Sequence, residues 1–180
     1  LCFGDSNTHG YCADPMDCED RGERFNENER WTCLLQRKLG DEYLVLEEGL
    51  SGRTTVFDDP LHESMSGLDV IYSTLMTHEP VDLLIIMLGT NDTKLRFGMT
   101  PMTIGQSMMQ LVRTAKQYAV NEAGETAHII IAAPPRILDN LMQTRHAECF
   151  GEQAIAVSAG LSRELRRISK LMRCDFFDAV

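Results

Sequence analysis

Five short apolar runs divide the chain, and a longer helix-like segment lies between each run and the next. The runs are Leu1–Phe3, Tyr43–Leu46, Leu83–Leu88, Ile129–Ala133 and Phe176–Phe177. This alternation predicts an α/β fold with a parallel sheet of about five strands. The unbroken apolar character of Leu83–Leu88 and of residues 129–131 is typical of strands that are buried on both faces of such a sheet.

Two of the intervening segments carry clear helical patterns. Thr100 and Pro101 predict the start of a helix, with Thr100 as the N-cap and Pro101 in the first turn. Apolar residues recur at helical spacing in both segments, so each helix should bury one stripe. The stripes are Met108, Leu111, Val112, Ala115 and Tyr118 in the first helix, and Ala154, Val157, Leu161, Leu165, Ile168 and Met172 in the second.

The composition narrows the class of protein. A chain of 180 residues that is 43% hydrophobic can build one core, so we expect a single domain over residues 1–180. A formal net charge of −10 argues against binding nucleic acid, which selects basic surfaces. The longest apolar run, Leu83–Leu88, is too short to span a bilayer.

The six cysteines are widely spaced and form no C-x-x-C pair, and none stands at metal-ligand spacing to a histidine. We therefore expect free thiols, no metal, and a cytoplasmic protein. The sequence lacks an initiator Met, and apolar runs lie at both ends. These features predict a fragment truncated at both ends, in which any signal peptide would lie ahead of Leu1.

Small and polar residues follow three of the apolar runs. Gly4-Asp5-Ser6-Asn7-Thr8 follows the first run, Gly49-Leu50-Ser51-Gly52-Arg53-Thr54 the second, and Gly89-Thr90-Asn91-Asp92 the third. The carboxyl ends of parallel strands share one edge of the sheet, where ligands bind. Ser6 could attack an ester there, while the N–H groups of Ser6 and Gly52 and the Asn91 amide stabilise the oxyanion.

Each of these residues also has a structural interpretation. Ser6 could be a helix N-cap, Gly52 could serve a tight turn, and Asn91 with Asp92 could cap the next helix. Asp5 is better suited to supporting the nucleophile turn than to chemistry. A flavodoxin-like binding module with a phosphate at the Ser6 turn is a further alternative, which Asp5 and the lack of a glycine-rich phosphate loop disfavour.

Two long segments, residues 9–30 and 134–150, follow strand ends and are candidate walls or lids of the site. A solvated surface loop is the alternative for the first. Apolar residues on these loops could instead form a homo-oligomer interface. Arg53 and Lys94 adjoin the proposed site and could meet a charged substrate, although solvation at the surface is their more ordinary role. His146 lies in the second of these segments and could have a binding role, although a surface position is its more ordinary expectation.

Together these three blocks resemble those of the SGNH hydrolase (GDSL esterase/lipase) superfamily, in order and spacing, over most of the chain. Flanking stretches are similar to its arylesterase/acyltransferase branch. They are Arg30-Trp31-Thr32, Glu47-Glu48-Gly49-Leu50-Ser51, Ile85 to Lys94, and Phe176-Phe177-Asp178-Ala179.

The resemblance implies a flavodoxin-like α/β/α sandwich and a serine esterase that needs no cofactor. It would hydrolyse small acyl or aryl esters and could pass the acyl group to alcohols. It also implies Ser6 as nucleophile and Gly52 and Asn91 as oxyanion donors. A carbohydrate O-deacetylase, a thioesterase and a non-catalytic homologue remain alternatives.

The family's catalytic histidine follows its aspartate by three residues in an Asp-x-x-His block near the C-terminus. The only such spacing here is Asp59-Pro60-Leu61-His62, between the second and third blocks, and we interpret it as coincidence. We expect the true pair beyond Val180. Residues 1–180 alone should then have little or no esterase activity.

Overall fold

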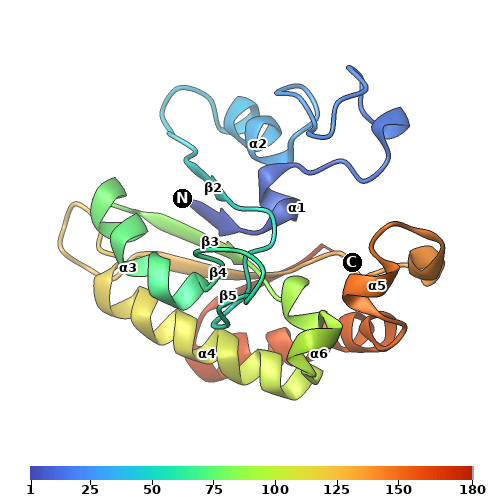
Figure 1. The fold of residues 1–180 in the computed structure, drawn as a ribbon. Helices are drawn as coiled ribbons and strands as arrows, with labels where there is room; N and C mark the ends of the chain where they lie inside the picture. Colours follow the sequence, from blue (N-terminus) through green and yellow to red (C-terminus); the bar gives the residue numbers. More distant parts are fainter. Residues whose placement is uncertain (180) are drawn as a thin grey trace.

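The computed structural model describes residues 1–179, and its centre is a five-stranded parallel sheet (Figure 1). The strands stand in the order β2-β1-β3-β4-β5. They are β1 (Cys2–Gly4), β2 (Glu47–Gly49), β3 (Leu83–Met87), β4 (His128–Ala133) and β5 (Asp175–Asp178). All four neighbouring pairs are parallel, as the alternation of apolar runs and helical segments predicts.

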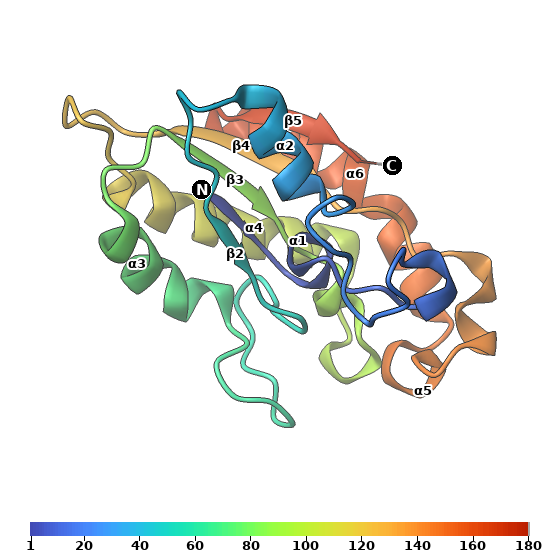
Figure 2. The same ribbon diagram turned by 90° about the horizontal axis from the view of Figure 1, so that it is seen from above.

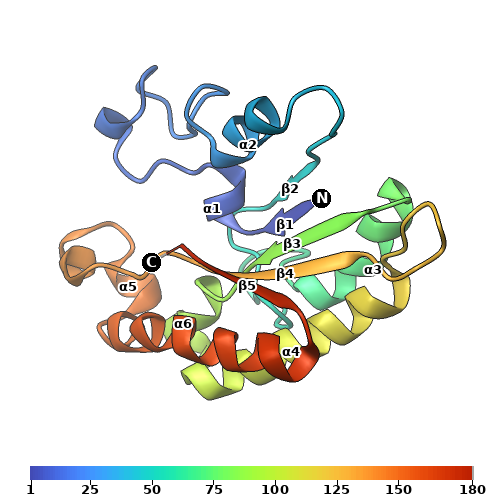
Figure 3. The ribbon, with the colours of Figure 1, turned by 180° about the vertical axis from the view of Figure 1, so that it is seen from behind.

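Helices cover both faces of this sheet, so the fold is the expected three-layer α/β/α arrangement. The helices α3 (Gly67–His78), α4 (Pro101–Tyr118) and α6 (Gln153–Met172) lie on one face, and α2 (Trp31–Leu39) lies on the other (Figures 1 and 3). The shorter helices are α1 (Ser6–His9), α5 (Ala147–Phe150) and the 3-10 turns Pro15–Asp17, Asn91–Thr93, Leu95–Phe97 and Asp139–Gln143.

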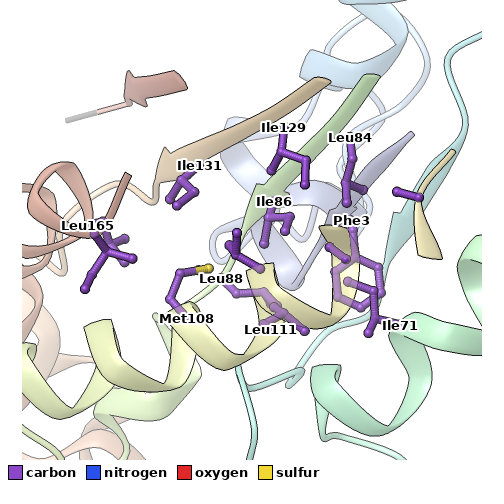
Figure 4. Close-up of a cluster of buried hydrophobic side chains, with 14 of the residues drawn as sticks. Phe3, Ile71, Leu84, Ile86, Leu88, Met108, Leu111, Ile129, Ile131 and Leu165 are labelled. Atoms are coloured by element: carbon purple, nitrogen blue, oxygen red, sulfur yellow. The ribbon is translucent and has the colours of Figure 1, made fainter. Parts of the chain in front are cut away.

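The two predicted apolar stripes are confirmed. Helix α4 begins at Pro101, and a capping box closes its start. The Thr100 hydroxyl accepts from the backbone N–H of Thr103, and the Thr103 hydroxyl accepts from the backbone N–H of Thr100. The stripes of α4 and α6 pack against the sheet in a core that contains Phe3 and the centres of β3 and β4 (Figure 4). The core members that Figure 4 labels are Phe3, Ile71, Leu84, Ile86, Leu88, Met108, Leu111, Ile129, Ile131 and Leu165.

Burial of the central strands differs between the two faces. Leu84 and Ile86, which face this core, are fully buried, whereas Leu83, Ile85 and Ile130 are only half-buried. The prediction of strands buried on both faces therefore holds only in part for the face on which α2 lies, where Cys2 and Met87 are buried. Within residues 1–179, α2 covers the β1–β2 side of that face rather than its whole width (Figure 3).

The predicted strand at Tyr43–Leu46 is also wrong in its position, because β2 spans Glu47–Gly49. Tyr43 and Leu44 are exposed, and the register pairs Glu47 with Cys2 and Gly49 with Gly4. As an edge strand, β2 can hold charged residues whose side chains find partners on either face.

Candidate active site

Ser6 is the first residue of α1, a single helical turn directly after β1. The N-cap of this turn is Asp5, whose Oδ1 accepts from the backbone N–H of Asn7 at 2.9 Å. The Asn7 amide also donates to Asp5 Oδ1 at 2.9 Å and to Thr90 Oγ1 at 3.2 Å. Trp31 Nε1 donates to the Asn7 carbonyl at 3.1 Å. Asp5 therefore fills the capping role that was one interpretation of Ser6, and the half-buried serine stands on a braced turn.

Gly52 lies in the turn after β2, with a φ of +99° that side chains disfavour. The Arg53 N–H donates to the Leu50 carbonyl at 3.0 Å and closes this turn. The turn lies close to α1, since a Cβ on Gly49 would stand 2.2 Å from the backbone nitrogen of His9. Within residues 1–179, neither the Gly52 nor the Ser6 N–H has an acceptor in the surrounding loops and caps.

The Asn91 side chain connects the three strand ends. Asn91 is the first residue of the 3-10 turn after β3 and is 5% exposed. Its Nδ2 donates to the Arg53 carbonyl at 3.1 Å. The same nitrogen lies 3.5 Å from Asp5 Oδ2, a long contact. The amide thus contacts the residue next to Gly52 and the residue next to Ser6. Asn91 therefore lies against the residues that adjoin the other two positions singled out from the sequence.

Two buried carboxylates lie directly behind these groups. Burial raises the pKa of Asp5 to about 6, against the hydrogen bonds that Asn7 donates to it. Burial likewise raises the pKa of Asp92 to about 6, although the Thr55 N–H and hydroxyl both donate to its carboxylate. The Asp92 charge adds to the upward shift in the pKa of Asp5.

No histidine among residues 1–179 makes a hydrogen bond to the Ser6 hydroxyl. The Asp59 side chain is fully buried and pairs with Lys94 Nζ and Arg96 Nη2, each at 3.2 Å. His62 is exposed, and the bond between the two residues joins the His62 N–H to the Asp59 carbonyl. The Asp59-x-x-His62 spacing is a coincidence, because this carboxylate serves two cations.

The two long loops contact one another beyond the carboxyl ends of the strands (Figure 2). The Tyr11 hydroxyl lies 3.2 Å from His146 Nε2, and Arg145 pairs with Glu23 at 3.4 Å. Burial, with the charges of Arg145 and Lys94, lowers the pKa of His146. The simple surface histidine expected at position 146 is thus wrong, because the ring is half-buried in a contact between loops.

The solvated roles expected for Arg53 and Lys94 are also wrong, since both side chains are buried. Lys94 pairs with Asp59, and Arg53 binds main-chain carbonyls. These partners could not be recognised in the sequence, because Asp59 lies 35 residues from Lys94. Apolar neighbours on both sides would have been the usual hint of burial, and neither residue has them.

All six cysteines are free thiols in the structure. Over the described residues 1–179, no group of three or more His, Cys, Asp or Glu side chains is arranged to hold a metal ion. In the same part of the chain, no helix has the length and apolar character needed to cross a bilayer.

Comparison with known proteins gives a family match over nearly the whole chain. The model of the GDSL-like Lipase/Acylhydrolase family matches residues 2–179. A comparison with curated proteins found no match.

Solved structures resemble the chain closely. An aryl esterase of M. smegmatis is 37% identical with a TM-score of 0.88, over 99% of this chain and 82% of that one. The carbohydrate acetylesterase Est24 of Sinorhizobium meliloti is 34% identical with a TM-score of 0.85, over 99% and 82% of the two chains. A putative arylesterase of Agrobacterium tumefaciens is 31% identical with a TM-score of 0.85, over the same shares.

Proposed function

Because the chain belongs to the GDSL-like lipase/acylhydrolase family and is a carboxylic ester hydrolase, we propose that Ser6 is its nucleophile. Ser6 Oγ attacks the carbonyl carbon of the ester, and its proton passes to a general base. The tetrahedral intermediate then expels the alcohol or phenol, which takes up that proton. The acyl group stays on Ser6 until water attacks it.

The oxyanion of the intermediate is held by three donors in this proposal. They are the main-chain N–H groups of Ser6 and Gly52 and the Nδ2 group of Asn91. The observation that carries the proposal is the Asn91 amide, which contacts Arg53 O at 3.1 Å and Asp5 Oδ2 at 3.5 Å. One hydrogen of Nδ2 is fixed by Arg53, and the other has only the long contact with Asp5. This second hydrogen is the one available to an oxyanion.

The general base is proposed to be a histidine supplied from outside residues 1–180. No histidine among residues 1–179 makes a hydrogen bond to the Ser6 hydroxyl, and His146 and His78 are engaged by Tyr11 and Glu48. The one Asp-x-x-His spacing is excluded because Asp59 pairs with Lys94 and Arg96.

We infer small aryl or short-chain acyl esters as substrates, on the similarity to the M. smegmatis aryl esterase. Carbohydrate acetates are the second candidate, on the similarity to Est24. The ratio of kcat/KM for p-nitrophenyl acetate to that for an acetylated sugar separates the two. Release of an alkyl acetate when an alcohol is added would show that the acyl-enzyme also transfers its acyl group to alcohols.

The nucleophile is tested by labelling the full-length enzyme with a fluorophosphonate and locating the adduct by peptide mass spectrometry. The adduct is expected on Ser6, with no labelling and no esterase activity in Ser6→Ala. Ser51→Ala is the matched control, because Ser51 lies in the turn after β2 and has no role in the proposed chemistry. The Ser51→Ala enzyme should be labelled on Ser6 and should hydrolyse esters normally. An adduct on another residue, or activity that survives Ser6→Ala, would refute the assignment.

A further inference from the structure

Arg53 joins the ends of two strands through a single nitrogen atom. Its Nη1 donates to the Gly4 carbonyl at 3.1 Å and to the Glu48 carbonyl at 2.5 Å. Gly4 ends β1 just before the Ser6 turn, and Glu48 lies in β2. The side chain therefore fixes the end of β1 to the strand that leads into the Gly52 turn.

The main chain of Arg53 holds the other two parts of the proposed oxyanion site. Its N–H closes the turn that contains Gly52 by donating to Leu50 O at 3.0 Å. Its carbonyl accepts from Asn91 Nδ2 at 3.1 Å. One residue thus connects the turns that carry the nucleophile, the Gly52 N–H and the Asn91 amide.

This arrangement is unfavourable for a side chain whose only role is packing. The Arg53 side chain is buried, and none of the described carboxylates pairs with its guanidinium group, which lies 4.4 Å above the centre of the Phe3 ring. Within residues 1–179, Nε has no hydrogen-bond partner. Burial lowers the pKa of Arg53, against the attraction of Glu48 and Asp5. An apolar side chain of similar volume would fill the same space without this desolvation.

We propose that Arg53 is a positioning residue, which holds the Gly52 N–H and the Asn91 amide at a fixed place relative to Ser6. The inference rests on the proposed function of these three residues. A displacement of about 1 Å at a reacting centre can lower a rate by about 100-fold. Holding the strand ends together by two carbonyl contacts prevents such a displacement, and this is the physical benefit that offsets the buried charge.

The test compares Arg53→Met and Arg53→Lys in the full-length enzyme with p-nitrophenyl acetate. Arg53→Met keeps the volume and removes both contacts, so kcat should fall by about 10- to 100-fold with KM changed less than about threefold. Arg53→Lys should recover a large part of this loss, because one ammonium nitrogen can replace Nη1 at both carbonyls. A side chain that only packs predicts no such recovery by lysine.

Arg30→Met is the matched control. Arg30 is buried to a similar degree, at 7% exposure against 6% for Arg53, and also donates to a main-chain carbonyl, that of Phe25. In the described part of the chain it pairs with Glu47 on the same edge strand and makes no hydrogen bond to Ser6, Gly52 or Asn91. Its loss should lower the melting temperature and leave kcat within about twofold of wild type, as a purely structural change does.

Two results would overturn the inference. One is a wild-type kcat in Arg53→Met, and the other is an equal fall in kcat in Arg30→Met at an equal loss of melting temperature. If Arg53→Met does not fold, Arg53→Ala takes its place and is assayed below its melting temperature. A wild-type kcat in Arg53→Ala would then contradict the inference, whereas a lowered kcat in Arg53→Ala that is restored in Arg53→Lys would support it. Failure of the proposed function is seen separately, as activity that survives Ser6→Ala.

Discussion

Replacing Asn91 with alanine should separate a catalytic loss from a structural one. The substitution removes the Nδ2 donor, and loss of one oxyanion donor lowers kcat by about 10² to 10³, or about 2.7–4 kcal/mol of barrier. It also leaves the buried Arg53 carbonyl without its 3.1 Å partner. An unsatisfied buried acceptor costs about 1–3 kcal/mol of folding stability. At about 2–4 °C per kcal/mol for a protein of this size, the melting temperature should fall by about 2–12 °C.

The assay is steady-state hydrolysis of p-nitrophenyl acetate at 25 °C, paired with a thermal melt of each variant. Ser66→Ala is the control, because Ser66 caps α3 by accepting from the Asp69 N–H at 3.4 Å, and loss of a cap costs about 1 kcal/mol. It should melt earlier and keep its kcat. A kcat in Asn91→Ala within about threefold of wild type would refute the assignment of Asn91 as an oxyanion donor, since loss of such a donor lowers kcat by about 10² to 10³.

Gly52→Ala must adopt a φ of +99° at about 1–2 kcal/mol, and its Cβ would stand 3.0 Å from Met65 Sδ. The substitution keeps the N–H but strains its turn, so thermal melts should show lower stability and kinetics a lower kcat. An unchanged kcat at lowered stability would contradict the view that the exact position of this N–H matters to the reaction. Burial raises the pKa of Asp92 from 3.8 to about 6, so at pH values between these two the folded protein binds a proton that the unfolded chain has released. The stabilisation that comes from this group is therefore lost as the pH rises through that window, by up to about 3 kcal/mol. Asp92→Asn lacks that titration, so its melting temperature relative to wild type should rise from pH 4 to pH 7, whereas parallel profiles would contradict the raised pKa. Residues 1–180 expressed alone should show little turnover of p-nitrophenyl acetate, since no described histidine makes a hydrogen bond to the Ser6 hydroxyl. A full rate that Ser6→Ala abolishes would contradict an external base.

The sheet could be predicted because its signal is local. Runs such as Leu83–Leu88 are apolar over the length of a strand, and the stripes of α4 and α6 repeat at helical spacing. The edge strand could not be placed this way. Glu47 and Glu48 face partners at Arg30 and His78, so this strand lacks the apolar pattern on which the prediction depends.

The candidate site was partly predictable for a different reason. Ser6, Gly52 and Asn91 each follow a predicted strand, and parallel topology places such residues at one edge. Their supporting partners lie far away in sequence, as Thr55 does from Asp92 at 37 positions. Nothing local distinguishes a threonine that binds a buried carboxylate from one in a surface turn.

These partners decide how the site is held together. Hydrogen bonds from side chains join the carboxyl ends of β1, β2 and β3 in pairs. Arg53 donates to the Gly4 carbonyl, Asn91 to the Arg53 carbonyl, and Asn7 to the Thr90 hydroxyl. The paired register of β1 and β2 ends at Gly4 and Gly49, and the next main-chain bond, from the Leu50 N–H to the Gly4 carbonyl at 3.1 Å, comes before any of the proposed reacting groups. The precision of the oxyanion site therefore depends on these buried polar contacts. Substitutions there should lower kcat more than their effect on stability would suggest, while substitutions in the apolar core should do the reverse.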